Sequence, residues 1–80
     1  MEVIDVLKTG TRIREAIDDV GMTVSDMADK ISVSVGAVYR WCEGYSLPTL
    51  DNLVILSYFT KTPIDYLIVR RKVVECTNTE

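Results

Sequence analysis

Histidine is absent from this chain of 80 residues, and cysteine occurs only at Cys42 and Cys76. Without an imidazole, the sequence lacks the most frequent general base, a histidine metal ligand and a Cys–His nucleophile pair. Cys42 is predicted to be a small, partly buried apolar residue on a helix, and Cys76 an exposed thiol in a polar tail. We therefore expect no catalytic residue, no metal site and no cofactor.

Long apolar runs are missing as well. No run reaches the ~18 residues that a membrane-spanning helix requires, and the opening MEVIDVLKTG lacks the basic start of a secretory signal. The length corresponds to one domain, residues 1–80. A domain of this size buries only about 60% of its unfolded surface, so an oligomer interface would help it. We expect a soluble, cytoplasmic protein without membrane association.

Positive charge is scarce. The net charge is −3 and the pI is about 4.8, which argues against non-specific affinity for nucleic acid, because that affinity rests on Lys and Arg. Within residues 21–48, Lys30 and Arg40 stand against Asp26, Asp29 and Glu43. Residues 21–48 therefore carry a small negative net charge.

Apolar residues recur at helical spacing in two consecutive segments. The first has Ile13, Ala16, Ile17 and Val20 on one face, and the second has Val24, Met27, Ala28 and Ile31. Gly21 is a typical C-terminal stop for the first helix. Thr23 is a typical N-cap for the second, and Asp26 three residues later completes a capping-box pattern.

A third helix is predicted after a turn of only three residues. Ser34 is its expected N-cap, Val38 and Trp41 lie one turn apart on its inner face, and Gly44 ends it. We expect Trp41 to anchor the core rather than to stack on bases. The first turn, SVGA, contains only small or β-branched residues, which makes it a weak helix start.

Two further helices follow. Thr49 is the expected N-cap of the fourth, and Thr62 that of the fifth, with Pro63 at its first helical position. The fold class is therefore all-α, with a five-helix core at about residues 9–69 and a tail at 70–80. The two Val- and Ile-rich ends can either pair as a short antiparallel ribbon or fray. The run RRK at 70–72 suits a phosphate clamp or a solubilising tail equally well.

Helices two and three, joined by a short turn, form a helix-turn-helix at about residues 24–43. Ala28 of the second helix is small where the third helix must approach closely. With Val38 and Trp41 inward, the outward residues of the third helix are Val35, Gly36, Tyr39, Arg40 and Glu43.

The chain resembles the XRE family of DNA-binding regulators, the lambda-repressor-like five-helix domain that includes phage Cro proteins. The resemblance covers roughly residues 9–69 and runs through TRIREAIDDVGMTVSDMADKISVSVGAVYRWCEGYSLPTLDNLVILSYFTKTPIDYLI. Its individual signals are the RIRE opening, the GMT lead into the second helix, the W-x-x-G close of the third, and the segments LPTLDNLVILS and TPIDYLI.

The resemblance implies that helix 34–43 enters the major groove. The residues that would then meet bases or flanking phosphates are Ser34, Val35, Gly36, Ala37, Tyr39 and Arg40 on this helix, Thr23, Val24 and Ser25 at the amide end of the second helix, and Tyr45 and Ser46 in the following loop.

The sequence departs from the family pattern in three ways. Val24 stands where the family often has a Gln that braces a phosphate, so that contact would fall to backbone amides or to the hydroxyls of Thr23 and Ser25. Ser32 stands where the turn often has Gly, at a cost of ~1 kcal/mol if its backbone is left-handed. On the reading surface, only Tyr39 and Arg40 can hydrogen-bond to bases, which indicates a reliance on apolar contacts and DNA shape.

Two cations on the first helix have two interpretations. Arg12 and Arg14 can reach phosphates, or they can pair with Glu15 and Asp18 on a solvated face, which is favoured for Arg14.

The leading hypothesis is a sequence-specific DNA-binding transcriptional regulator, expected to be a repressor. It would bind double-stranded DNA as a homodimer on a near-palindromic operator, without a small-molecule ligand. The alternative is a protein-interaction module, such as an antirepressor or an antitoxin-like partner, that keeps the fold with weak or no DNA binding. The acidic balance and Val24 favour the alternative, whereas Tyr39, Arg40 and the small first turn favour DNA.

Overall fold

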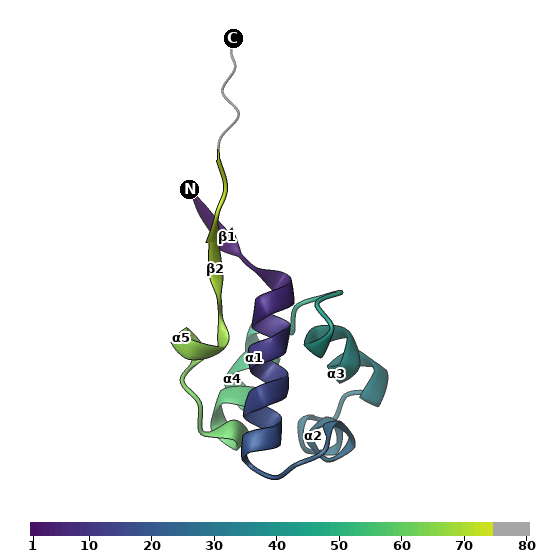
Figure 1. Ribbon diagram of the computed structural model, residues 1–80. Helices are drawn as coiled ribbons and strands as arrows, with labels where there is room; N and C mark the ends of the chain where they lie inside the picture. Colours follow the sequence, from purple (N-terminus) through teal and green to yellow (C-terminus); the bar gives the residue numbers. More distant parts are fainter. Residues whose placement is uncertain (75–80) are drawn as a thin grey trace.

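Five α-helices and one two-stranded ribbon make up the computed structural model, which describes residues 1–74 (Figure 1). The elements, in chain order, are β1 (Glu2–Ile4), α1 (Val6–Asp19), α2 (Val24–Ile31), α3 (Val35–Cys42), α4 (Leu50–Thr60), α5 (Ile64–Leu67) and β2 (Arg70–Lys72). The all-α, five-helix prediction is confirmed. Among the described residues, no helix is long and apolar enough to span a membrane. The expectation for Cys76 concerns a residue outside the described part of the chain.

The core lies where α1, α2, α3 and α4 meet. Its fully buried side chains include Ile13 and Ile17 of α1, Met27 of α2, Val38 of α3 and Leu56 of α4. These residues follow the helical spacing of the sequence, so burial of one face per helix is the main stabilising term.

Trp41 and Cys42 close the core at the C-terminal end of α3. Trp41 is only 6% exposed, which confirms it as a core anchor. Cys42 is buried too, and desolvation raises the pKa of its thiol to about 11. The thiol therefore stays protonated at neutral pH and behaves as the small apolar residue that the sequence indicated.

Helix α1 begins at Val6, earlier than the helical core starting near residue 9 that the sequence suggested. Asp5 is its N-cap, and the Asp5 carboxylate accepts a hydrogen bond from Lys8 N–H (2.9 Å). Gly10 is poor for helix propensity but is required by packing. A Cβ there would overlap the Trp41 carbonyl oxygen and lie 2.7 Å from the Cys42 carbonyl oxygen.

Most predicted caps are confirmed. The Thr23 hydroxyl accepts from Asp26 N–H (3.0 Å), the Ser34 hydroxyl from Ala37 N–H (3.1 Å), and the Thr49 hydroxyl from the third residue after it. Because helix starts leave N–H groups without intrahelical acceptors, these bonds fix where the helices begin.

The prediction of Thr62 as the N-cap of the fifth helix is wrong. Pro63 occupies the N-cap position without a side-chain cap bond. Lys61 ends α4 in the left-handed conformation (φ 55°), and the chain reverses there. The Thr62 hydroxyl consequently donates back to the Thr60 carbonyl (3.2 Å) instead of capping α5.

The chain ends pair as the ribbon that the sequence left open. β1 and β2 are antiparallel, with Val3 opposite Arg71. Buried Thr9 holds the base of the ribbon, because its hydroxyl accepts from Val69 N–H (2.9 Å). The ribbon therefore ties the two ends of the described chain to the start of α1.

Candidate nucleic-acid interface

The turn between α2 and α3 sets the angle of the helix-turn-helix. Ser32 adopts the left-handed conformation (φ 65°, ψ 45°), as the departure from glycine suggested. Val33 N–H donates to the Ala28 carbonyl (3.1 Å), so the chain leaves α2 within one turn. Ala28 is fully buried, which lets the two helices approach closely as expected.

The first turn of α3 presents a small surface. Val35 is 39% exposed, and Gly36 is exposed as well. A Cβ added at Gly36 would find the Ser34 hydroxyl at 3.9 Å as its nearest neighbour. The fold itself therefore does not require glycine at this position. Ala37, in contrast, is half-buried against the core and offers less surface than the sequence suggested.

Aromatic and cationic side chains alternate along the outer side of α3 and the loop after it. Tyr39 is 42% exposed and Tyr45 71% exposed. The Arg14 guanidinium carbon lies 6.0 Å from the centroid of the Tyr39 ring, and that of Arg40 lies 5.9 Å from the Tyr45 ring. At these distances the rings attract the cations and hold them beside α3.

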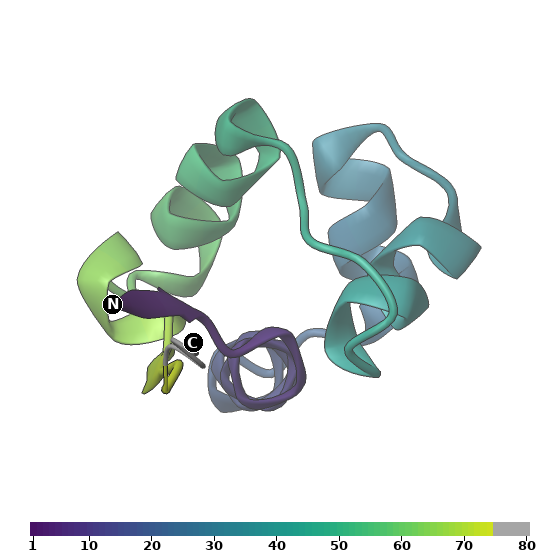
Figure 2. The same cartoon turned by 90° about the horizontal axis from the view of Figure 1, so that it is seen from above.

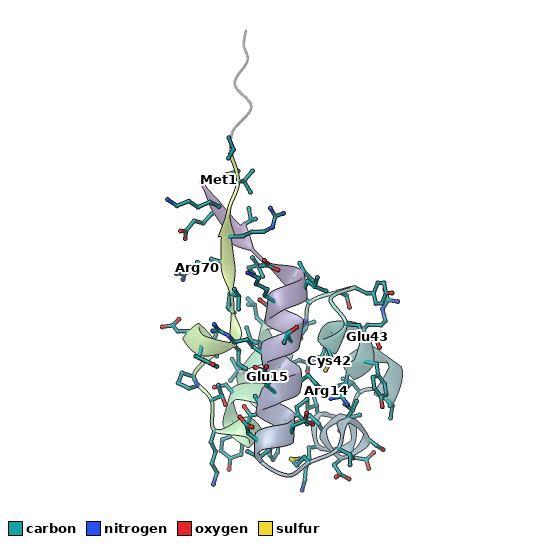
Figure 3. The ribbon with its side chains drawn as sticks, viewed as in Figure 1. Met1, Arg14, Glu15, Cys42, Glu43 and Arg70 are labelled. Carbon is teal, nitrogen blue, oxygen red and sulfur yellow. The ribbon has the colours of Figure 1, made fainter. Side chains whose placement is uncertain are left out.

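Arg14 is the residue that sequence reasoning missed as a neighbour of this surface. It lies on the side of α1 that faces α3 (Figure 3). It also pairs with Asp18 (3.7 Å) on the solvated face, which confirms that part of the prediction. Only packing of α1 against α3 reveals its second neighbour, because Arg14 and Tyr39 are remote in the sequence.

Arg12 does neither of the things that the sequence suggested. Its Nη1 donates to the Tyr66 carbonyl (2.7 Å), and its guanidinium stacks on the Tyr66 ring at 4.1 Å. Arg12 is therefore a structural link between α1 and α5 rather than a partner of Glu15.

The amide end of α2 carries its own anion. Thr23 N–H donates to the Asp26 carboxylate (3.1 Å), which completes the capping box. This bond from the Thr23 backbone, with the Thr23 hydroxyl, lowers the pKa of Asp26. The side chain of Val24 is buried, so only its amide can face a ligand. The donors that stay available to a phosphate are the Val24 amide and the amide and hydroxyl of Ser25. They lie next to the Asp26 carboxylate, which repels a phosphate.

The loop after α3 is fixed by backbone contacts. Tyr45 N–H and Ser46 N–H both donate to the Arg40 carbonyl, at 2.9 and 3.4 Å. Gly44 permits this turn with φ 81°, and a Cβ there would approach Cα of Leu7 to 2.9 Å. Tyr45 therefore stands at a defined place beyond the C-terminal end of α3.

Two groups of residues from α1, α3 and the adjoining loops therefore lie on this side of the molecule: the small first turn of α3, and a set of exposed Tyr and Arg side chains. The residues brought to this side are Ser34, Val35, Gly36, Tyr39, Arg40, Tyr45 and Arg14. Two exposed acidic residues are close in the chain: Asp26 lies in the first turn of α2, and Glu43 is the C-cap of α3.

Comparison with known proteins gives one match. A helix-turn-helix family model matches residues 13–67, which span α2, α3, α4 and α5 completely. Neither a search of curated proteins nor one of solved structures finds a match to the chain. Because the family model covers more than half of the sequence, the chain belongs to the XRE-type helix-turn-helix family of DNA-binding regulators.

Proposed function

We propose that this regulator is a sequence-specific repressor that binds double-stranded DNA through α3. The observation that carries the proposal is the open space around Gly36. A glycine inside a helix costs stability, and here no protein atom occupies the place of a side chain. A DNA surface pressed against the first turn of α3 accounts for that small residue.

The proposed contacts follow from chemistry and exposure. Arg40 would take guanine O6 and N7 or a phosphate, and Val35 would pack on a thymine methyl. Tyr39 and Tyr45 would contact the edge of the groove and the backbone. Ser34 would contribute through its backbone amide, because its hydroxyl is already used as a cap. The amides of Ala37 and Ser46 are bonded within the protein, so these two residues would contribute through the Ala37 methyl group and the Ser46 hydroxyl.

The α2 end makes a weaker contact in this proposal. The amides of Val24 and Ser25 suit a phosphate, but the Asp26 carboxylate repels it, and Thr23 is engaged in the capping box. Few cations imply few neutralised phosphates and hence weak binding by one copy. Two copies on a near-palindromic operator would restore affinity through two half-sites about one helical turn apart.

The test is selection of bound duplexes from a random pool, followed by salt titration of the selected site. Arg40→Gln should weaken binding and reduce the slope of log K against log salt by ~0.9 if Arg40 neutralises one phosphate. Lys61→Gln, which removes one positive charge at the C-terminal end of α4, is the matched control and should leave the slope unchanged. Equal slopes for the two variants would contradict a phosphate contact by Arg40.

A second candidate function is a protein-interaction module. The carboxylate at the α2 end favours it, because this position repels the phosphate that helix-turn-helix proteins commonly place there. Absence of any duplex binding at low salt, with a folded protein, would select this candidate over the repressor.

A further inference from the structure

Among residues 1–74, no third strand pairs with the ribbon of β1 and β2, so the ribbon has two free edges. Asp5 N–H donates to the Val69 carbonyl (2.7 Å). From this pair onward, hydrogen-bonded and non-hydrogen-bonded pairs alternate along the ribbon. Because every second residue of an antiparallel strand bonds to its neighbour, Val3 bonds to β2, and the N–H and C=O groups of Glu2 and Ile4 point to the outside. The ribbon extends from the helical body at the start of α1 (Figure 1), which leaves both edges open to another strand.

The β2 edge is protected by charge. Its three residues, Arg70, Arg71 and Lys72, are all exposed cations. If β2 paired with β2 of a second copy about Arg71, Arg70 would lie opposite Lys72 and Arg71 opposite itself. Like charges directly opposite are destabilising, and cations are a common device that keeps edge strands apart.

The β1 edge is complementary to itself. A two-fold axis at Val3 places Glu2 opposite Ile4 of a second copy, so no like charges face each other. The outward N–H and C=O groups of both residues then meet their counterparts. The geometry points to a homodimer in which two β1 edges join into one four-stranded antiparallel sheet, in the order β2, β1, β1, β2. This inference rests on the homodimer of the proposed function and names its interface.

An apolar hollow beside the base of the ribbon supports the same arrangement. Its volume is about 330 Å³, and its lining includes Ile4, Leu47, Leu50 and Ile68. The lining residues come from β1, α1, the connection after α3, α4 and the segment after α5. Figure 2 shows how α1, this connection and α4 are arranged when seen from the end that carries the ribbon. Leu50, at the rim, is 81% exposed, so no part of the chain between residues 1 and 74 covers this apolar surface.

The tip of the ribbon supplies an apolar cover. Val74 is 89% exposed and follows Lys72 by two positions, which puts its side chain on the same face as Ile4. Antiparallel pairing of two ribbons places the tip of each ribbon beside the base of the other. The ribbon is only a few residues long, at ~3.3 Å per residue, so tip and base are close together. Val74 of the second copy would thus lie over the hollow. Because both contacts form together, the association closes as a symmetric dimer.

The alternative pairing joins β1 of one copy to β2 of the next. It brings Glu2 near a cation, but it leaves one edge of each kind free at the ends. Such a head-to-tail contact joins more than two copies, either in a ring or in an open chain that lengthens with rising concentration. Size in solution therefore separates the two arrangements.

The first experiment is sedimentation equilibrium of the full chain without DNA, over a series of protein concentrations. Proline removes one outward N–H at either edge, so Glu2→Pro and Lys72→Pro are matched variants at directly opposed positions. Glu2→Pro should raise the dimer dissociation constant about tenfold or more, and Lys72→Pro should leave it unchanged. A monomeric wild-type chain, species larger than a dimer, or equal effects of the two prolines would overturn the proposal. Thermal melting followed by circular dichroism verifies that both variants fold.

The second experiment is a disulfide cross-link between two copies, and its readout does not depend on destabilising the ribbon. On the two-fold axis, Val3 meets itself as a non-hydrogen-bonded pair with Cα atoms ~4.5 Å apart, within the range of a disulfide. In a Cys76→Ser background, Val3→Cys should form a disulfide-linked dimer on mild oxidation, and Arg71→Cys on the opposite strand should not. Failure of the Val3→Cys link, or equal linking of both variants, would contradict the β1 interface. Because neither experiment contains DNA, a negative result here leaves the DNA-binding proposal to its own test.

Discussion

Replacement of Gly36 by alanine separates the demands of the fold from those of DNA. In the free protein, the added Cβ meets nothing closer than the Ser34 hydroxyl at 3.9 Å, which is ordinary van der Waals contact. Glycine in a helix is less favourable than alanine by roughly 0.5–1 kcal/mol. Gly36→Ala should therefore stabilise the domain by about that amount. For a domain of this size, 1 kcal/mol corresponds to roughly 4–8 °C in Tm, so we expect an increase of about 2–8 °C.

The same substitution should weaken operator binding. If the backbone of the first turn of α3 lies against the groove, a methyl group at Gly36 holds the helix away from it. The loss of the closest contacts should raise Kd at least about tenfold, which corresponds to ~1.4 kcal/mol. Melting by circular dichroism and titration of the selected duplex, on the same preparation, measure both effects. An unchanged Kd together with a higher Tm would refute the idea that DNA approaches the first turn of α3.

Three further substitutions test individual features of the fold and the site. Ser32→Gly relieves a left-handed backbone (φ 65°) and should raise the free energy of unfolding by about 1 kcal/mol. A lower Tm in the glycine variant would contradict that conformation. Gly10→Ala should destabilise the domain by about 1–3 kcal/mol, since the Cβ would meet the carbonyl oxygens of Trp41 and Cys42, and urea unfolding measures this. The folded state lowers the pKa of Asp26, so its stabilising contribution is present above the unfolded value of 3.8 and is lost as the pH falls through the lower folded value. Asp26→Asn should therefore reduce the dependence of the free energy of unfolding on pH at acidic pH. It should also strengthen duplex binding at low salt, and unchanged binding would show that the carboxylate does not face a phosphate.

Local signals in the sequence determined most of the helical frame. Thr23, Ser34 and Thr49 cap α2, α3 and α4 as predicted, because a cap needs only a hydroxyl within three residues of the amide it serves. The inward positions of Val38 and Trp41 followed from helical spacing in the same way. The family resemblance added the expectation that α3 faces the groove of DNA, which spacing alone does not give.

Only the tertiary structure decided the features that join distant parts of the chain. The early start of α1 depends on Gly10 lying against the end of α3, although its propensity argues against a helix there. Arg12 reaches α5 instead of a neighbour on its own helix, and Arg14 lies beside Tyr39. The pairing of β1 with β2 depends on Thr9 holding Val69 at the base of the ribbon. In each case, the energy comes from contacts between residues far apart in sequence, which periodicity and capping patterns do not encode.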